Sequence, residues 1–304
     1  MSMSIQTNVS SLNAQRNLST SQLALSKSMQ RLSSGFRINT AADDSAGLAI
    51  SENMRGQIRS MNQATRNAND GVSLIQTAEG ALNETSSILV RMRELAEQSA
   101  TGTVGSTERG YIQSEFNKLT SEIDRIAGST EFNGRKLLDG TMCGDGTVTT
   151  TPGNGTMVFH IGPRNDTSIG NTNNSTAGNA LDRVTLDVSA ASSTAIGVNF
   201  GSTTSVQVST QAGAQSALNS IDSAIASISS QRSNLGATQN RLQSTINNLA
   251  VAIENTSSAE SRIRDVDVAS ETATMTRNNI LTQAGTAILS QANQTPQAAL
   301  SLLK

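Results

Sequence analysis

The chain has 304 residues, of which 36% are hydrophobic and only 2% aromatic, and it carries a formal net charge of −2. Large aromatic side chains are the usual fillers of a thick globular core, so their scarcity favours thin contacts between helices. The nearly balanced charge excludes a protein that attracts nucleic acid or an anionic membrane through its overall field, and no apolar run approaches the roughly 20 residues of a membrane span.

The first element that the sequence predicts is an amphipathic helix over residues 5–33. Its narrow apolar stripe consists of Val9, Leu12, Leu18, Leu25, Met29 and Leu32. Gly35 is a stop signal for a helix, and the connector that follows ends in Asp43 and Asp44, either of which can cap the next helix. The first residues contain no apolar signal-peptide core, so a protein of this kind that works outside the cell is expected to leave without a cleaved signal.

The longest predicted element runs from Met54 to Ala96, where every seventh residue is apolar. A sustained seven-residue repeat keeps one seam of a helix facing a partner helix. At a rise of 1.5 Å per residue this helix would be about 64 Å long, which exceeds an ordinary compact core. The large residues of its seam are Met54, Met61, Ile75, Leu82 and Leu89. Such a rod must find a partner elsewhere in the chain or in another chain.

A shorter helix and a hairpin are predicted after the rod. Ser106 is a candidate cap, and apolar residues then follow at alternating four- and three-residue spacing: Ile112, Phe116, Leu119, Ile123 and Ile126. Gly128 closes this helix. Two turn signals, Asn133-Gly134 and Asp139-Gly140, come next and predict a β-hairpin nearby.

From residue 141 to about residue 210 the composition changes, and Gly, Thr, Ser and Asn dominate. Apolar residues alternate with polar ones in short runs at 157–161, 184–188, 196–200 and 206–208. Alternation of this kind is typical of a half-buried strand. We therefore predict a small, loop-rich β module.

The C-terminal part of the chain returns to helical periodicity. A second seven-residue repeat predicts a rod over residues 211–264 that pairs antiparallel with the first rod, with its seam at Ile221, Ile228, Leu235, Leu242 and Leu249. An amphipathic helix with Ile280, Ala284 and Ile288 follows. Thr295 can cap a short final helix that has Pro296 at its first position. The chain then ends with Leu300, Leu302 and Leu303.

Little in the sequence supports catalysis. The chain holds one cysteine, Cys143, and one histidine, His160. A single thiol can form neither an internal disulfide nor a zinc site. The two residues lie apart in loop-like settings, so a Cys–His nucleophile is not expected. We expect a cysteine in a turn, a histidine on a surface strand, and no catalytic residue, metal or cofactor.

Several runs of the chain resemble bacterial flagellin. In the N-terminal part these are SIQTNVSSLNAQRNL, LSSGFRINTAADDSAGLAIS, NQATRNANDGVSLIQTAEGALNE and EFNGRKLLDG, and in the C-terminal part LGATQNRLQSTINNL, RIRDVDVASE and QAGTAILSQANQTPQAALSLLK. Both ends are similar to the family while the middle is not, which is the layout of flagellins. The resemblance implies a mainly α fold, in which the N- and C-terminal regions form long antiparallel coiled-coil rods and a β-hairpin and a β module are inserted in the middle.

The resemblance also implies a function and an arrangement of domains. The chain would be a structural subunit of the helical bacterial flagellar filament, outside the cell, and not an enzyme. Residues 1–43 and 265–304 would form a terminal helical domain around a central channel, residues 44–140 and 211–264 a rod domain, and residues 141–210 a variable surface module. The partners would be copies of itself, an export chaperone, the filament cap and hook-junction proteins, with no nucleic acid and no membrane.

Two alternatives stay open at this point. The hook–filament junction protein shares the terminal patterns, although the density of matches at both ends favours the filament subunit. A secreted coiled-coil adhesin or effector would contact a host through its β module. That protein would tolerate deletion of residues 1–40 or 265–304.

The charged run VRMRELAEQ allows two interpretations. Charges such as Arg91, Glu94 and Glu97 ordinarily form a solvated helix face with ion pairs between successive turns. In flagellins similar to this chain, the corresponding face is bound by the host Toll-like receptor that senses flagellin. The positions that match are Arg91, Leu95 and Glu115, whereas Glu97 departs from the best-known pattern.

The two terminal stripes hold few large apolar residues for their length. Ordering one residue costs about 1–2 kcal/mol of backbone entropy, and burying one Leu or Ile returns about 1.5–3 kcal/mol. Roughly one large apolar residue in four barely covers that cost. A fixed helix pair in the isolated molecule is the alternative, but we expect the ends to fold when neighbouring subunits cover them.

Overall fold

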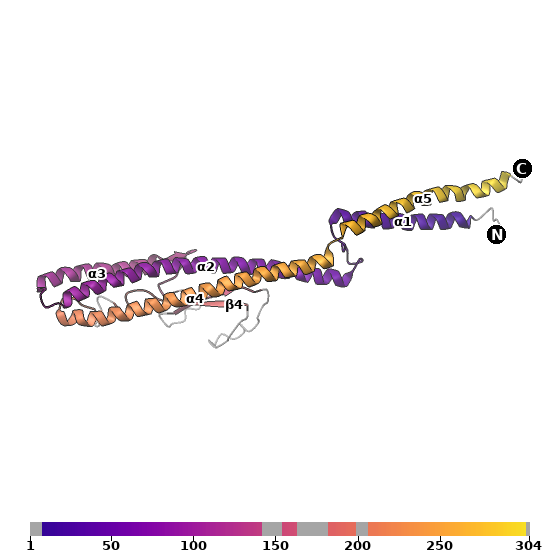
Figure 1. The fold of residues 1–304 in the computed structure, drawn as a ribbon. Helices are drawn as coiled ribbons and strands as arrows, with labels where there is room; N and C mark the ends of the chain where they lie inside the picture. The colour runs from indigo at the N-terminus through magenta and orange to yellow at the C-terminus, as the bar shows by residue number, and fades with distance from the viewer. Residues whose placement is uncertain (1–7, 142–153, 163–181, 199–205, 302–304) are drawn as a thin grey trace. The chain divides into compact units, whose positions relative to one another are not determined.

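The computed structural model describes residues 8–141, 154–162, 182–198 and 206–301. Within these ranges the helices are α1 (Val9–Ser34), α2 (Ser45–Ala100), α3 (Ser106–Ser129), α4 (Gln211–Arg264) and α5 (Val268–Ser301) (Figure 1). Strands β1 (Glu131–Phe132) and β2 (Arg135–Lys136) form a hairpin, and β3 (Asn154–His160) pairs antiparallel with β4 (Arg183–Ser189). The predicted mainly α fold with inserted β elements is confirmed.

The chain divides into two compact units, which are described separately. The first comprises residues 1–58 and 254–304, and the second comprises residues 59–253. Helices α2 and α4 each contribute to both units. The functional domains drawn from the sequence stay a prediction.

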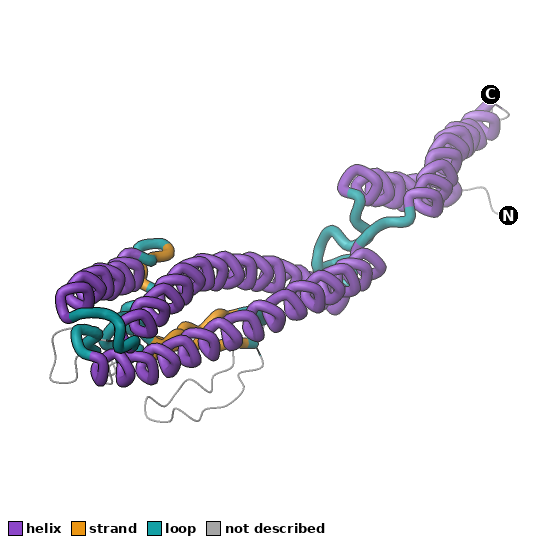
Figure 2. Tube along the Cα trace, turned by 60° about the vertical axis from the view of Figure 1, so that its left-hand side comes forward, coloured by secondary structure: helices purple, strands orange, loops and turns teal. Residues whose placement is uncertain are grey.

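In the second unit, α2 lies beside both α3 and α4 (Figures 1 and 2). All the predicted seam residues of this unit are buried, namely Met61, Ile75, Leu82, Leu89, Ile221, Ile228, Leu235, Leu242 and Leu249. Met54, which belongs to the first unit, is half-buried. Helix α2 also buries adjacent residues such as Leu95 and Ala96, because a helix that faces more than one neighbour needs a wider apolar stripe than a two-helix seam.

The expected hairpin forms at the Asn133-Gly134 signal. Asn133 and Gly134 have φ angles of 52° and 74°. Positive φ at both central residues is what a type I′ turn requires, and this turn matches the twist of the two strands that it joins.

The β3–β4 sheet packs against the helices through one face. Along β4, Val184, Leu186 and Val188 are buried and the residues between them are exposed, as the alternation predicted. Gly71 on α2 permits this close packing, because a Cβ there would lie 3.2 Å from Leu242 on α4 and 3.2 Å from the ring of Phe159 on β3. The predicted strands at 157–161 and 184–188 are confirmed, except that β3 ends at His160 and does not include Ile161.

The strand predicted at 196–200 is wrong for the residues that the structure describes. Residues 193–197 form a turn, with Gly197 at a φ of 78°, and Phe200 lies outside the described residues. Asp124 on α3 accepts hydrogen bonds from the amide and the hydroxyl of Ser193, both at 2.8 Å. A side chain from a helix therefore accepts the hydrogen bond of a backbone amide that would otherwise need a partner on a neighbouring strand.

The strand predicted at 206–208 is also wrong. These residues do not form a strand, although Val206 and Val208 are buried. The Val208 amide donates to Gln113 Oε1 at 2.6 Å, and the Ser99 hydroxyl donates to the Val208 carbonyl. Alternation identified the buried side chains correctly, but it could not show that helices α2 and α3 supply the polar partners.

In the first unit, α1 and α5 lie side by side and antiparallel (Figure 1). Helix α5 continues through Pro296 to Ser301, so the predicted helix start at Thr295 is wrong. Proline has no N–H and cannot bond to the carbonyl four residues earlier, which is that of Ala292. The side-chain amide of Asn8 donates to this oxygen at 2.7 Å. The helix thus tolerates the proline at a position where another residue supplies a donor.

Candidate self-assembly surface

Small residues bring α1 and α5 together. Ala14 and Ser28 on α1 and Ala292 on α5 are buried. Gly285 lies so close to α1 that a Cβ there would be 3.2 Å from Leu18 Cδ1. Small side chains let two helices approach closely, but they remove little apolar area from water. The hydrophobic contribution of this contact is therefore small.

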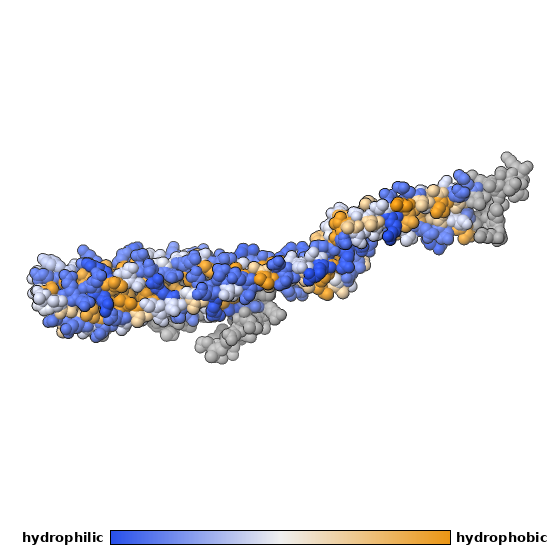
Figure 3. Space-filling model, in the orientation of Figure 1, coloured by the Kyte–Doolittle hydropathy of each residue, from blue (hydrophilic) through white to orange (hydrophobic). Residues whose placement is uncertain are grey.

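Large apolar side chains of the same helices face solvent instead. Val9 and Leu23 on α1 are 69% and 70% exposed, and Ile280 and Ile288 on α5 are 61% and 59% exposed. Figure 3 shows hydrophobic patches on the surface of this pair. Clustered apolar side chains that stay in water mark an interaction site. We call this surface of α1 and α5 the terminal apolar surface.

The structure divides the predicted assembly residues between two environments. The exposed ones are Val9, Leu12, Met29, Ile280, Ala284 and Ile288, and the half-buried ones are Leu18, Leu25 and Leu32. The side chain of Leu300 and all of Leu302 and Leu303 lie outside the described residues. The periodicity misses Leu23 and Leu281, which are exposed but lie beside the stripe that it traces. Their apolar character in a polar stretch was the only available signal.

A strap of residues 35–44 joins α1 to α2 and is held by charge. Lys27 Nζ on α1 lies 2.6 Å from the carboxylate of Asp43. The amides of Asn39 and Thr40 donate to the same carboxylate. The Lys27 ammonium and these amides hold the pKa of the Asp43 carboxyl well below its usual range, because they favour its charged form.

Arg264, the last residue of α4, holds the strap from the other side. Its guanidinium lies 4.6 Å from the centre of the Phe36 ring and 2.6 Å from Glu52 on α2, and its carbonyl accepts the Arg37 amide at 2.7 Å. Arg264, followed by Arg55, lowers the pKa of the Glu52 carboxyl. The strap is thus tied to both α2 and α4 within the first unit.

The residues predicted to contact a host receptor do not all reach the surface. Arg91 and Glu115 are exposed and form an ion pair at 3.0 Å, and Glu94 lies 2.9 Å from the same guanidinium. Glu94 and then Glu115 raise the pKa of Arg91 above its ordinary value. Leu95, in contrast, is only 2% exposed. The structure brings two of the three residues together and places the third in the core.

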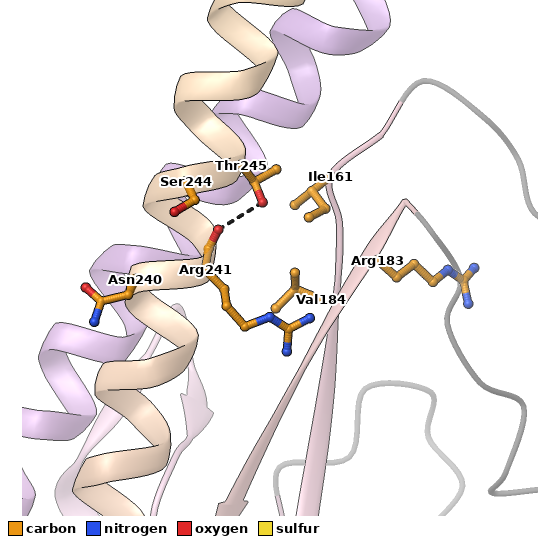
Figure 4. Close-up of a pocket in the computed structure, with 7 residues that line it drawn as sticks. All are labelled: Ile161, Arg183, Val184, Asn240, Arg241, Ser244 and Thr245. Carbon is orange, nitrogen blue, oxygen red and sulfur yellow. Dashed lines mark hydrogen bonds between the residues drawn. The ribbon is translucent and has the colours of Figure 1, made fainter.

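The close-up in Figure 4 shows an open pocket of about 380 Å³ between α4 and the β3–β4 sheet. It is lined by Ile161, Arg183, Val184, Asn240, Arg241, Ser244 and Thr245. The Thr245 hydroxyl donates to the Arg241 carbonyl at 2.9 Å. The Arg241 side chain extends toward Val184, whereas Arg183 extends away from the helix. The two guanidinium groups therefore do not converge on one ligand position.

His160 lies on the strand edge of a second pocket, of about 430 Å³, which Asp70 and Arg135 also line. The residue is exposed, and its carbonyl accepts the Asn67 side-chain amide at 3.0 Å. Cys143 lies outside the described residues. Across the ranges that the structure covers, no three His, Cys, Asp or Glu side chains gather where they could hold a metal. No described helix combines the length and the hydropathy that a bilayer crossing requires.

The paired terminal helices leave their large apolar side chains in water. This is the arrangement expected of a structural subunit that assembles with copies of itself. The family model of the bacterial flagellin N-terminal helical region matches residues 5–142, and that of the C-terminal helical region matches residues 218–303. The chain belongs to the bacterial flagellin family. It is a structural subunit of the extracellular flagellar filament and polymerises with copies of itself.

Relatives over the whole length agree with this assignment. The chain is 48% identical over 322 residues to a flagellin of Bacillus subtilis and 44% identical over 306 residues to the flagellar filament 33 kDa core protein of Treponema phagedenis. Each comparison covers 99% of this chain and 100% of the relative. A putative flagellar hook-associated protein from Vibrio parahaemolyticus is 16% identical, with a TM-score of 0.53 over 73% of this chain and 100% of that chain. This last likeness shows the fold alone.

Replacing Asp43 with Asn should lower the melting temperature of filaments at pH 7 and flatten its dependence on pH. A carboxyl whose pKa is depressed by folding adds stability above its ordinary pKa of about 3.9, and that stability is lost as the pH falls through the lower, folded-state value. The parent filament should therefore lose more melting temperature between pH 7 and pH 3 than D43N does. The control E84Q makes the same charge change at an exposed position of α2. Parallel curves for D43N and the parent would contradict this role of Asp43.

Proposed function

We propose that the terminal helices become fully ordered only when neighbouring subunits cover the terminal apolar surface. The observation that carries this proposal is that α1 and α5 bury small residues against each other and leave Val9, Leu23, Ile280 and Ile288 mostly in water. Ordering each residue costs about 1–2 kcal/mol. A contact in which small residues are buried, while Leu18, Leu25 and Leu32 are only half-buried, returns too little hydrophobic free energy to meet that cost in a solitary molecule.

The proposed domains follow from the same reasoning. Residues 1–43 and 265–304 pack around a central channel, residues 44–140 and 211–264 form the surrounding wall, and residues 141–210 face outward. The contacts are heterologous, because each surface meets a different surface of the next copy. A heterologous contact that does not close into a ring continues as a helix.

Further partners are proposed from the resemblance to flagellins. The chain passes through the flagellar export apparatus unfolded. A cytoplasmic chaperone binds the C-terminal helices before export, and the exposed Ile280 and Ile288 supply an apolar surface for it. Assembly then proceeds under a cap protein, next to hook-junction proteins. A hook–filament junction role is not favoured for the chain itself, because its full-length relatives are flagellins and a filament core protein.

Hydrogen exchange before and after seeded assembly tests the proposed coupling of folding and assembly. Dilute subunits should exchange rapidly across residues 9–34 and 268–301, and the same residues should become protected when filament seeds are added. Residues 59–100 and 211–253 should be protected in both states, since they supply the buried core. Slow exchange of the termini in the solitary subunit would contradict the proposal. Normal elongation after deletion of residues 1–40 would also contradict it, because the deleted chain would lack most of the terminal apolar surface.

We also propose that the host Toll-like receptor for flagellin binds the exposed face that carries Arg91 and Glu115. An arginine and a glutamate on neighbouring helices offer a receptor groups of both signs, which favours a specific orientation of the complex. Leu95 acts from the core, where it supports the α2 segment that carries Arg91. This role differs from the direct contact that the sequence suggested.

Exchanging the two charges, as in R91E/E115R, should preserve stability and weaken receptor activation about tenfold or more. An exposed ion pair contributes about 0–1 kcal/mol, and the exchange rebuilds the pair between positions 91 and 115 in the opposite direction. The new glutamate at position 91 also faces Glu94, and a like-charge pair on successive helical turns costs only about 0.2–0.5 kcal/mol. Thermal melting of the subunit and a receptor reporter assay measure the two effects. The control R125E/E122R exchanges another exposed pair, on α3, and should leave activation unchanged. Equal activation by both variants would rule out this face.

A further inference from the structure

One oxidation-sensitive side chain lies on the terminal apolar surface. Met29 on α1 is 51% exposed, whereas the adjacent Ser28 is buried. Residues three and four positions apart are neighbours on a helix, so Met29 lies beside Leu25 and Leu32, which are both half-buried. The thioether of Met29 is therefore at the edge of the contact between α1 and α5, where a dissolved reagent can reach it.

The other methionines that the structure describes are better protected. Met61 and Met92 are buried in the core of the second unit. The half-buried ones are Met54, Met157 and Met275. Because an oxidant must reach the sulfur in order to react, Met29 is the most reactive methionine among the described residues of the folded subunit.

Oxidation changes this side chain from apolar to polar. In the reaction with hydrogen peroxide, the sulfur lone pair attacks one peroxide oxygen, so that an S–O bond forms and the O–O bond breaks. The sulfur gives two electrons to the peroxide, and the departing oxygen takes the proton of the transferred oxygen and leaves as water. The product, methionine sulfoxide, disrupts interfaces that bury methionine, because a buried polar group without a hydrogen bond is unfavourable.

We propose that Met29 is an oxidation site that controls assembly. A peroxide oxidises Met29 in the unassembled subunit, and the sulfoxide opposes coverage of the terminal apolar surface by neighbouring copies. Assembly in turn protects the sulfur, since the copies that cover the surface exclude the oxidant. The addition of subunits is thus sensitive to oxidant, whereas the finished filament is resistant. The block is reversible, because methionine sulfoxide can be reduced enzymatically.

Peroxide treatment of matched full-length variants tests this role. A C143S/M275L background removes the thiol and the single methionine of α5. Peptide mass spectrometry measures oxidation at each methionine, and sedimentation of polymer after removal of the peroxide measures the critical concentration. Oxidation of Met29 should raise the critical concentration about tenfold, which corresponds to about 1.4 kcal/mol. M29L subunits given the same treatment should stay within about twofold of untreated ones, because leucine cannot form a sulfoxide.

Further variants separate the sulfoxide from other damage. M29Q places a polar group at the same position and should raise the critical concentration without peroxide. The methionine sulfoxide reductases for the two epimers should restore the oxidised subunits. M61L, at a buried position, leaves Met29 in place and should keep the full sensitivity to peroxide. Equal inhibition with and without Met29, no inhibition although Met29 is oxidised, or unimpaired assembly of M29Q would overturn the proposal.

Control by Met29 rests on the proposed coverage of the terminal apolar surface, and oxidation rates separate the two. Met29 should oxidise about tenfold more slowly in filaments than in solitary subunits, because neighbouring copies bury it. Equal rates in both states would contradict the coverage itself. If filaments protect Met29 but its sulfoxide leaves the critical concentration unchanged, the coverage stands and only the control by oxidation is refuted.

Discussion

Subunits that carry I280S and I288S are expected to stop elongating filament seeds at concentrations at which the parent chain polymerises. The two side chains are 61% and 59% exposed on α5, so neighbouring copies must supply most of their burial. Full burial of an isoleucine is worth about 1.5–3 kcal/mol, and the exposed share of the two amounts to about 2–4 kcal/mol. The critical concentration should rise about 30-fold or more. Sedimentation of polymer over a series of subunit concentrations measures it.

Two controls distinguish a lost contact from a damaged subunit. I280L/I288L keeps the apolar area and should assemble within a few-fold of the parent, and Q283S alters an exposed polar residue on the same helix. The melting temperature of the solitary I280S/I288S subunit should match that of the parent, because both changes lie at exposed positions. Normal elongation of this variant would show that the outer face of α5 is not a subunit contact.

Truncation of Phe116 to Ala should cost the second unit about 3–5 kcal/mol of stability. The ring is fully buried in the core shared by α2, α3, α4 and the strands, and its removal leaves a cavity as well as lost apolar burial. Because the interior is close-packed, the surrounding side chains can fill that space only in part. The melting temperature should fall by about 10 °C or more, as measured by circular dichroism on the dilute subunit.

The matched control is Y111A on the same helix. Tyr111 is 72% exposed, so its truncation removes a ring of similar size and should change stability by no more than about 0.5 kcal/mol. Comparison of F116A with Y111A separates the effect of burial from the effect of removing an aromatic ring. A similar loss for both variants would mean that α3 is destabilised as a helix and that the core position of Phe116 matters little.

Helix positions could be predicted from the sequence because their signals are local. The seven-residue spacing from Met61 to Leu89 and from Ile221 to Leu249 identified residues that the structure buries. The Asn133-Gly134 turn was equally readable, since positive φ at successive residues is an intrinsic preference of this dipeptide. Each of these features depends on a few neighbouring residues.

The errors have a common physical cause. Val206 and Val208 look like a strand and are buried, yet Gln113 and Ser99 from distant helices bond to the Val208 backbone. Leu95 lies within a charged run of the sequence, but its own side chain is buried in the core. Pro296 looked like a helix start because the Asn8 donor, far away in sequence, was invisible in the local pattern.

The sequence by itself determined which stretches are helical, which residue of each turn is apolar and which family the chain resembles, because periodicity, caps and motifs are properties of consecutive residues. Only the tertiary structure decided which large apolar side chains remain in water, which polar side chains satisfy distant backbone groups, and where α1 stands against α5. Those outcomes depend on which groups come within bonding distance after the chain has folded, and no short stretch of sequence contains that information.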